Sequence, residues 1–272
     1  MSFIVIKEKI EPYNKKIIVE GDKSLSIRWA LLSSQSFAKS RSTNLLLSED
    51  VLNTLNCLKK LGVKIKVTKN FCEIVGVGLN GFKYKKALIL DAGNSGTLSR
   101  LIMGLLVHSK NNIKLIGDKS LSKRDFFRVS KPLEKFGAKY LTNFGKLPIN
   151  IKGTDNPLPI NYHETIGSAQ CKSAVMFAAL NTKGETVIKA KKSRNHSELL
   201  FKYLKLPIKI SKRKKFDLIK IKGGKKISAL NYKIPADISS SAFFIVLTAL
   251  IDRSKLKIKN VNINPSRTGL LI

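Results

Sequence analysis

The chain has 272 residues and 43% hydrophobic content, enough to bury the core of one large or two ordinary domains. Its 51 basic and 18 acidic residues give a formal net charge of +33, which favours anionic ligands and raises the question of nucleic-acid binding. No apolar run approaches the roughly 20 residues of a membrane span, and three cysteines without a CxxC pair indicate neither a disulfide framework nor a zinc site.

The start of the chain and the distribution of its charges indicate where the protein is located and whether it binds nucleic acid. The first residues, MSFIVIKEKIEPYNKK, lack the apolar core and cleavage site of a signal peptide, so we expect a cytoplasmic protein. Lysines occur in almost every segment, and aromatic residues rarely alternate with them as base stacking requires. In the densest stretch, 209–226, alternation predicts two short strands around a turn. We therefore favour a lysine-rich surface over nucleic-acid binding, with a non-catalytic nucleic-acid-binding remnant as an alternative.

Taken in chain order, four apolar segments each begin with small polar residues. Their starts are 72 positions apart, at Ser24, Gly96, Ser168 and Ser240. In the first three, a basic residue follows four positions later, which places it on the same helix face as the small residue; these residues are Arg28, Arg100 and Lys172. The pattern predicts three buried helices of an internal repeat and the start of a fourth copy.

A second series of helices, amphipathic rather than buried, alternates with the first. Its predicted starts are Ser48, Ser122 and Ser193, each a plausible serine cap. The repeating unit is therefore βαβαββ, and three copies span 21–234. The second helix of the fourth copy is due near Ser266, close to the last residue, so we expect that the sequence is incomplete.

The starts of the buried helices predict a site for an anion. Helix N-termini bind phosphates and carboxylates through unpaired N–H groups and the helix dipole. If the three helices are parallel, their starts converge, and nearby cations would add charge-assisted hydrogen bonds; these cations are Lys23, Arg28, Arg124 and Arg194.

Other catalytic signals are weak. His108 and His163 have no metal-ligand partner at helical spacing, so no metal site is predicted, whereas His196 is better placed near a helix start. The glycine-rich GNSGT at 93–97 is neither a Walker loop nor a dinucleotide fingerprint, and we expect no cofactor. Capping explains the acidic residues beside helix starts as well as catalysis does; these residues are Asp50, Asp91 and Asp237.

Seven motifs, in order, closely resemble the signatures of the 5-enolpyruvylshikimate-3-phosphate synthase family. They are GDKSLSIR, LDAGNSGTLSRLIMGLL, GDKSLSKRDFFRVSKPLEKFGA, SAQCKSAVMFAAL, SRNHSE, IPADISSSAFF and NPSRTG. The resemblance covers almost the whole chain and roughly the first three-fifths of a typical member. It implies an α/β fold, the inverted α/β barrel of enolpyruvyl transferases built from repeated βαβαββ units. Residues 21–234 would form one complete globe, and 1–20 with 235–272 part of a second, discontinuous globe.

The resemblance also implies an activity and a set of site residues. The family transfers the enolpyruvyl group of phosphoenolpyruvate to the 5-hydroxyl of shikimate 3-phosphate and releases phosphate, a step of the shikimate pathway to chorismate and the aromatic amino acids. Lys23 would contact both substrates and act in catalysis. Shikimate 3-phosphate would be bound by Lys23, Ser24, Arg28, Ser168, Ala169, Gln170, Ser193 and Arg194. Phosphoenolpyruvate would be bound by Lys23, Asn94, Gly96, Arg124 and Gln170.

Three departures from the family pattern matter. Asp125 stands where the family usually has proline, which places an acid beside Arg124, and Asn195 stands where an aspartate is common. The main catalytic carboxylates of the family lie beyond Ile272, so we expect the chain alone to bind shikimate 3-phosphate weakly and not to turn over. Gly96 keeps the small residue of glyphosate-sensitive members, and we expect a glyphosate-sensitive monomer at full length.

A related enolpyruvyl transferase, acting on UDP-N-acetylglucosamine, is the alternative within the superfamily. That branch carries a Lys-Asn pair where this chain has Lys23-Ser24, and a loop cysteine that GDKSLSKR lacks. We therefore expect the two small anions named above as the partners of this chain, rather than a sugar nucleotide.

Overall fold

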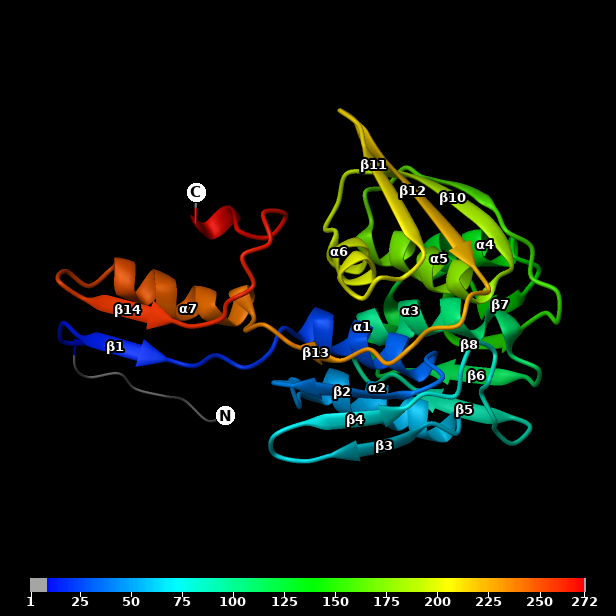
Figure 1. Ribbon diagram of the computed structural model, residues 1–272, viewed down its shortest axis with the longest axis horizontal. Helices are drawn as coiled ribbons and strands as arrows, with labels where there is room; N and C mark the ends of the chain where they lie inside the picture. The colour runs from blue at the N-terminus through cyan, green and yellow to red at the C-terminus, as the bar shows by residue number, and fades with distance from the viewer. Residues whose placement is uncertain (1–8, 272) are drawn as a thin grey trace.

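The structure is a computed structural model, and it describes residues 9–271. It contains three four-stranded sheets and a smaller part in which one helix packs on a strand pair (Figure 1). Each four-stranded sheet contains one pair of parallel strands at one edge. The two remaining strands follow across the sheet, and each is antiparallel to its neighbour. The predicted βαβαββ repeat is therefore confirmed in its strand order.

The first unit takes its first strand from a distant part of the chain. Its sheet has the order β13-β2-β4-β3, and β13 pairs in parallel with β2. The strands are β2 (Lys39–Thr43), β3 (Lys64–Val67), β4 (Cys72–Val75) and β13 (Tyr232–Lys233), and the helices are α1 (Lys23–Ser34) and α2 (Glu49–Lys60). The segment that precedes α1 in sequence pairs elsewhere, so the unit is contiguous only from α1 to β4.

The second and third units are contiguous in sequence. The second contains β5 (Leu88–Asp91), α3 (Gly96–Leu105), β6 (Ile113–Ile116), α4 (Phe127–Glu134), β7 (Lys139–Asn143) and β8 (Lys146–Lys152). The third contains β9 (Asn161–Glu164), α5 (Ala169–Asn181), β10 (Gly184–Lys191), α6 (His196–Tyr203), β11 (Ile208–Lys212) and β12 (Phe216–Gly223). The two strands predicted at 209–226 are β11 and β12, which pair in antiparallel fashion.

The first helices of the three units lie in the interior. Nearly every residue of α1, α3 and α5 beyond the first turn is buried, so these helices present no face to solvent there. α3 contacts both α1 and α5. Gly104 allows the backbones of α3 and α5 to approach, because a Cβ atom there would overlap the carbonyl oxygen of Ala174.

Two of the second-series helices begin later than predicted. Ser122 lies in a short 3-10 turn, η2 (Leu121–Lys123), because Asp118 Oδ1 accepts the Leu121 N–H at 2.7 Å and diverts the chain into a turn. The helix α4 then begins at Phe127, whose N–H donates to Asp125 Oδ1 (2.8 Å).

The starts of α6 and α2 differ from the prediction in their caps. α6 begins at His196 with Asn195, not Ser193, as its N-cap. Ser48 caps α2 by position, but its side chain forms no capping hydrogen bond.

The remaining elements form a smaller part beside the three units (Figure 1). β1 (Asn14–Ile17) pairs in parallel with β14 (Lys255–Ile258), and α7 (Ile238–Ala249) packs on β14. Phe243 on α7 and Leu250, the C-cap of α7, are 79% and 78% exposed. Near Ser266, where a second helix of a fourth copy was expected, the structure has the 3-10 turn η3 (Gly269–Leu271). Among residues 9–271, no helix is long and apolar enough to cross a membrane.

Replacing Gly104 by alanine is expected to destabilise the fold by about 1–3 kcal/mol, because the added methyl group forces α3 and α5 apart. Urea or thermal unfolding measures the change. Gly269→Ala is the matched control, since a Cβ atom there meets nothing within 4 Å. Equal midpoints for Gly104→Ala and the unmodified chain would contradict the close approach of the two helices.

Candidate functional site

A cavity of about 300 Å³ lies where the first turns of α1, α3 and α5 meet the start of α6. Its lining combines two arginines with small and polar side chains. The lining residues are Ser24, Arg28, Thr97, Gly167, Ser168, Ala169, Gln170, Ser193, Arg194 and His196. The structure thus brings together seven of the eight residues predicted to bind shikimate 3-phosphate, the exception being Lys23.

The three helix starts are organised by side-chain caps. Asp22, Ser95 and Ser168 accept a first-turn N–H of α1, α3 and α5 at 2.9, 3.3 and 3.3 Å. Ser24 is the second residue of α1 and Gly96 the first of α3, and their small size leaves room beside the first turn. Because a cap satisfies only one of the free N–H groups, the remaining groups give these helix ends their affinity for anions.

The three basic residues of the repeat are buried, and one of them, Arg28, also lines the cavity. Arg28 and Arg100 are 3% exposed, and Lys172 is fully buried. Each arginine folds back onto its own helix, since Arg28 Nη1 donates to the Ser24 carbonyl (3.0 Å) and Arg100 Nη1 to the Gly96 carbonyl (3.2 Å). The four-residue offset seen in the sequence therefore positions a buried cation under each helix start.

One acidic residue balances this buried positive charge. Glu198 of α6 pairs with Lys172 Nζ at 2.5 Å, with side-chain exposures of 4% and 0%. Beside it, Ser197 Oγ accepts from Arg28 Nε (2.8 Å) and lies 2.6 Å from Ser173 Oγ. The start of α6 is thus joined to α1 and α5 through two adjacent residues.

Gln170 connects the second and third units at the rim of the cavity. Its Oε1 accepts from Arg100 Nη1 at 2.6 Å, and its Nε2 donates to Thr97 Oγ1 at 3.1 Å. The Arg100 guanidinium also stacks 5.3 Å from the ring centroid of Phe126. These contacts fix the orientation of the Gln170 amide before any ligand enters.

The predicted phosphoenolpyruvate residues form a second group next to the cavity. Arg124 Nη2 donates to Asn94 Oδ1 (3.1 Å), and Asn94 Nδ2 donates to Asp118 Oδ2 (2.7 Å). A Cβ atom at Gly96 would lie 2.8 Å from Nη1 of both Arg100 and Arg124. Gly96 therefore sets how closely these two guanidinium groups approach the start of α3, while Asp125 is engaged with the start of α4.

Lys23 lies outside the lining of the cavity. Its side chain is 48% exposed, and its Nζ is 3.0 Å from Asp50 Oδ2. Its backbone N–H donates to Asp237 Oδ2 at 3.3 Å. Of the acidic residues noted beside helix starts, Asp237 is a cap for α7 and Asp50 is the ion-pair partner of Lys23.

Several residues of the site were not assigned from the sequence. Thr97 and His196 line the cavity, and Ser197 and Glu198 support it from below. Thr97 follows Gly96 directly and His196 opens a helix, so both positions could have been inferred from the helix starts. The buried pair of Lys172 and Glu198 gives no local signal, because its partners are distant in sequence.

At neutral pH, the surroundings of the cavity leave His196 neutral and Arg28 charged, although burial disfavours the charged form of both. Burial, with the nearby Arg28, Arg267 and Arg194, lowers the pKa of His196 to about 3. Burial also lowers the pKa of Arg28 to about 10, partly opposed by Glu198 and Asp22, so that Arg28 stays charged at neutral pH. Within the described residues, no group of three or more His, Cys, Asp or Glu side chains could hold a metal ion.

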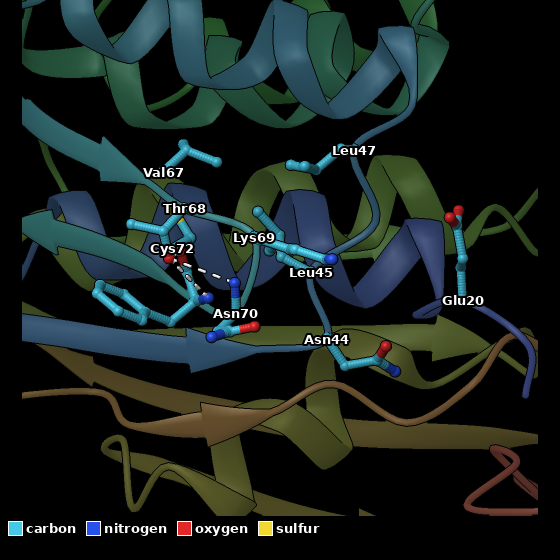
Figure 2. A pocket seen from close by; sticks show the side chains of 10 residues that line it. Glu20, Asn44, Leu45, Leu47, Val67, Thr68, Lys69, Asn70 and Cys72 are labelled. Atoms are coloured by element: carbon cyan, nitrogen blue, oxygen red, sulfur yellow. Dashed lines mark hydrogen bonds between the residues drawn. The ribbon is translucent and has the colours of Figure 1, made fainter.

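A second cavity, of about 200 Å³, lies at the turn between β3 and β4 (Figure 2). Thr68 Oγ1 accepts the N–H groups of Asn70 and Phe71 there, at 3.3 and 3.1 Å. Lys69 is the lysine of its lining, and Glu20 and Leu47 lie on the facing side. No start of a buried helix contributes to it, so we assign the anion site to the cavity at the helix starts.

Comparison with known proteins gives consistent matches. A family model described as EPSP synthase (3-phosphoshikimate 1-carboxyvinyltransferase) matches residues 7–272. The chain is 42% identical over 254 residues to the 3-phosphoshikimate 1-carboxyvinyltransferase of Ruthia magnifica subsp. Calyptogena magnifica, covering 93% of this chain and 57% of that protein. It is 40% identical over 272 residues to the protein of the same name in Vesicomyosocius okutanii subsp. Calyptogena okutanii, covering 100% and 61%.

A solved structure supports the same comparison. EPSP synthase from Acinetobacter baumannii is similar with a TM-score of 0.87 at 34% identity, over 96% of this chain and 58% of that one. The chain therefore spans about three-fifths of the length of the relatives it matches. The predicted fold class and the family resemblance are confirmed.

The neutral state of His196 predicts how stability depends on pH. Because its folded pKa of about 3 lies below the ordinary 6.5, the stability it contributes is fully present above pH 6.5 and is lost as the pH falls toward 3. His196→Gln should lower the slope of unfolding free energy against pH, by up to about one proton across this window. Urea unfolding at several pH values measures the slope. His163→Gln, in an exposed strand position, is the control, and equal slopes in both variants would contradict the prediction.

Proposed function

The chain belongs to the EPSP synthase family, and on that premise we propose that it builds the shikimate 3-phosphate-binding wall of an enolpyruvyl transferase. The proposed reaction transfers the enolpyruvyl group of phosphoenolpyruvate to the 5-hydroxyl of shikimate 3-phosphate and releases phosphate. The observation that carries the proposal is the cavity at the converging helix starts, which gathers Arg28 and Arg194 with Ser168, Ala169 and Gln170.

Shikimate 3-phosphate carries a carboxylate and a phosphate on different carbons of its ring, and the cavity offers two cationic regions. We assign the carboxylate to Ser24 and Arg28, on α1. We assign the phosphate to Ser168 and Ala169 at the start of α5, with Ser193 and Arg194 on the approach to α6. A helix N-terminus together with an arginine is a favourable environment for a phosphate dianion.

Phosphoenolpyruvate would bind on the adjacent side, next to the start of α3. Asn94, Gly96 and Arg124 are the proposed contacts there, and Gln170 would face both substrates because it lies between Thr97 and the cavity. The buried Arg100 holds Gln170 in place. This arrangement supplies preorganised positive charge for two polyanions and for the charged intermediate between them.

Lys23 is the proposed catalytic residue of this chain. Its ammonium group pairs with Asp50, and its half-exposed position would let it leave this pair and turn toward bound substrates. The resemblance places the main catalytic carboxylates outside these 272 residues, and the chain covers about three-fifths of its relatives. We therefore propose that the chain alone binds shikimate 3-phosphate and requires further residues for turnover.

The proposal extends to the setting of the enzyme. We place it in the cytoplasm as a monomer that uses small anionic substrates and no cofactor. UDP-N-acetylglucosamine remains the competing substrate, and a nucleic acid the competing partner. Neither competitor gains support from a specific contact in the cavity.

Binding of shikimate 3-phosphate tests the assignment of the cavity. Trp29, the single tryptophan, follows Arg28 directly and reports on α1 by fluorescence. Arg194→Gln should raise the dissociation constant by about 10- to 100-fold, because a charge-assisted hydrogen bond to the phosphate is lost. Arg41→Gln, at an exposed position of strand β2, is the matched control and should leave affinity unchanged. Tighter binding of UDP-N-acetylglucosamine or of DNA than of shikimate 3-phosphate would overturn the proposal.

A turnover assay tests whether the chain is sufficient for catalysis. We expect no release of phosphate when the purified 272-residue chain is mixed with shikimate 3-phosphate and phosphoenolpyruvate. A colorimetric phosphate assay, with a full-length relative as the positive control, measures this. Release above the substrate blank would show that the catalytic groups lie within this chain.

Gly96→Ala tests the phosphoenolpyruvate side. The new methyl group would press on Nη1 of Arg100 and Arg124, so both guanidinium groups must shift. In a full-length version we expect the KM for phosphoenolpyruvate to rise and inhibition by glyphosate to weaken, each by about tenfold or more. Unchanged constants for both ligands would place the second substrate elsewhere.

A further inference from the structure

The two parts of the molecule are joined where α1 and α7 begin. Two crossing segments, 20–22 and 235–237, run antiparallel, with the Asp22 N–H donating to the Pro235 carbonyl (2.8 Å) and the Asp237 N–H to the Glu20 carbonyl (3.0 Å). Each segment ends in an aspartate that caps its helix, since Asp22 accepts from the first turn of α1 and Asp237 from that of α7. The start of α1 is therefore built into the junction.

A third segment returns to this junction from the smaller part. We call residues 262–267, which follow β14, the strap. Asn262 Nδ2 donates to Asp22 Oδ2 at 3.1 Å, and Arg267 Nη1 lies 3.6 Å from the same oxygen. Arg267 Nη2 lies 3.9 Å from Asp237 Oδ1, and the Arg267 side chain is only 8% exposed. One guanidinium group thus bridges the capping carboxylates of both helices.

The strap also reaches the wall of the cavity. Asn195 Oδ1 accepts from Asn264 Nδ2 (2.8 Å) and from Ser266 Oγ (3.0 Å). Asn195 stands between Arg194 and His196, and both of these neighbours line the cavity. A strap contact at Asn195 therefore acts on the backbone that carries two cavity residues.

The use of the Asn195 side chain is unusual for its position. Asparagine at an N-cap ordinarily accepts a first-turn N–H of its own helix. Asn195 is the N-cap of α6, yet its side chain makes no capping hydrogen bond and is instead engaged by the strap. The strap is braced for this contact, because Asn264 Oδ1 accepts the N–H of Ser266 at 3.0 Å and lies 3.0 Å from the Ser266 Oγ.

We propose that the strap is a positioning segment for the cavity, in which Asn264 orients Arg194 and His196 through Asn195, and Arg267 orients the first turn of α1 through Asp22. Ligand affinity is then set partly by residues outside the three units. The identity of the ligand in this inference rests on the proposed function. The positioning contact itself does not depend on which anion binds.

The first experiment needs no ligand. Amide hydrogen exchange of the 272-residue chain should become faster at 195–199 in Asn264→Leu, which keeps the approximate size of the side chain and removes its hydrogen bonds. Exchange at 96–100, the first turn of α3, should stay unchanged and serves as the internal reference. Asn112→Leu, at an exposed bend between α3 and β6, is the matched control variant. Unchanged exchange at 195–199 in Asn264→Leu would overturn the positioning role.

The second experiment measures the dissociation constants of shikimate 3-phosphate and of inorganic phosphate. Asn264→Leu and Asn195→Leu should each weaken binding by about five- to tenfold, the loss of about one hydrogen bond, and the double variant should be no weaker than either. Asn195→Asp, which keeps the acceptor, should retain affinity.

A lower melting temperature with unchanged affinity in Asn264→Leu would reduce the strap to a purely structural role and overturn the inference. If the unmodified chain binds neither shikimate 3-phosphate nor phosphate, the proposed function fails. The exchange rates at 195–199 then still decide whether Asn264 positions the start of α6.

Discussion

The buried pair of Lys172 and Glu198 is the interaction on which the site depends most. Three cations lie under the converging helix starts, and Glu198 is the carboxylate that pairs with one of them at 2.5 Å and stands close enough to oppose the loss of charge on Arg28. Removing one partner of a buried ion pair leaves an uncompensated charge and costs about 3–5 kcal/mol. Because Glu198 and Ser197 also join α6 to α5 and α1, the same residues that stabilise the interior hold the cavity walls together.

The repeat explains how such a concentration of positive charge is tolerated. Arg28 and Arg100 occupy equivalent positions and use the same solution, a hydrogen bond to the carbonyl four residues earlier. The third unit has lysine at this position, and lysine, a compact charge without the planar fork of arginine, is instead paired with a carboxylate. The site is therefore a product of three similar units, each contributing a helix start and a buried cation, rather than a later addition to a finished fold.

Sequence reasoning was accurate where the determining contacts are local. Caps and apolar spacing placed α1, α3, α5 and α7 within two residues of their starts, and motif resemblance assembled most of the cavity. It was inaccurate where the local structure depends on a contact that the sequence pattern does not show. A two-residue strand such as β13 has no period to detect, Asp118 moves the start of α4 to Phe127, and the strap takes Asn195 away from its own helix. Lys23 was matched by its motif, but its ion pair with Asp50 depends on how α1 and α2 pack.

The pairing of β13 with β2 has a consequence for the order in which the chain folds. Tyr232 is paired with Ser42, and Trp29 Nε1 donates to the Leu230 carbonyl at 2.7 Å, so these contacts close a loop of about 190 residues. During synthesis the second and third units can form from contiguous sequence, whereas the first sheet lacks its edge strand until Lys233 has left the ribosome. The first of the three units to be translated is thus the last to be completed, and until then Trp29 lacks its hydrogen-bond acceptor at Leu230.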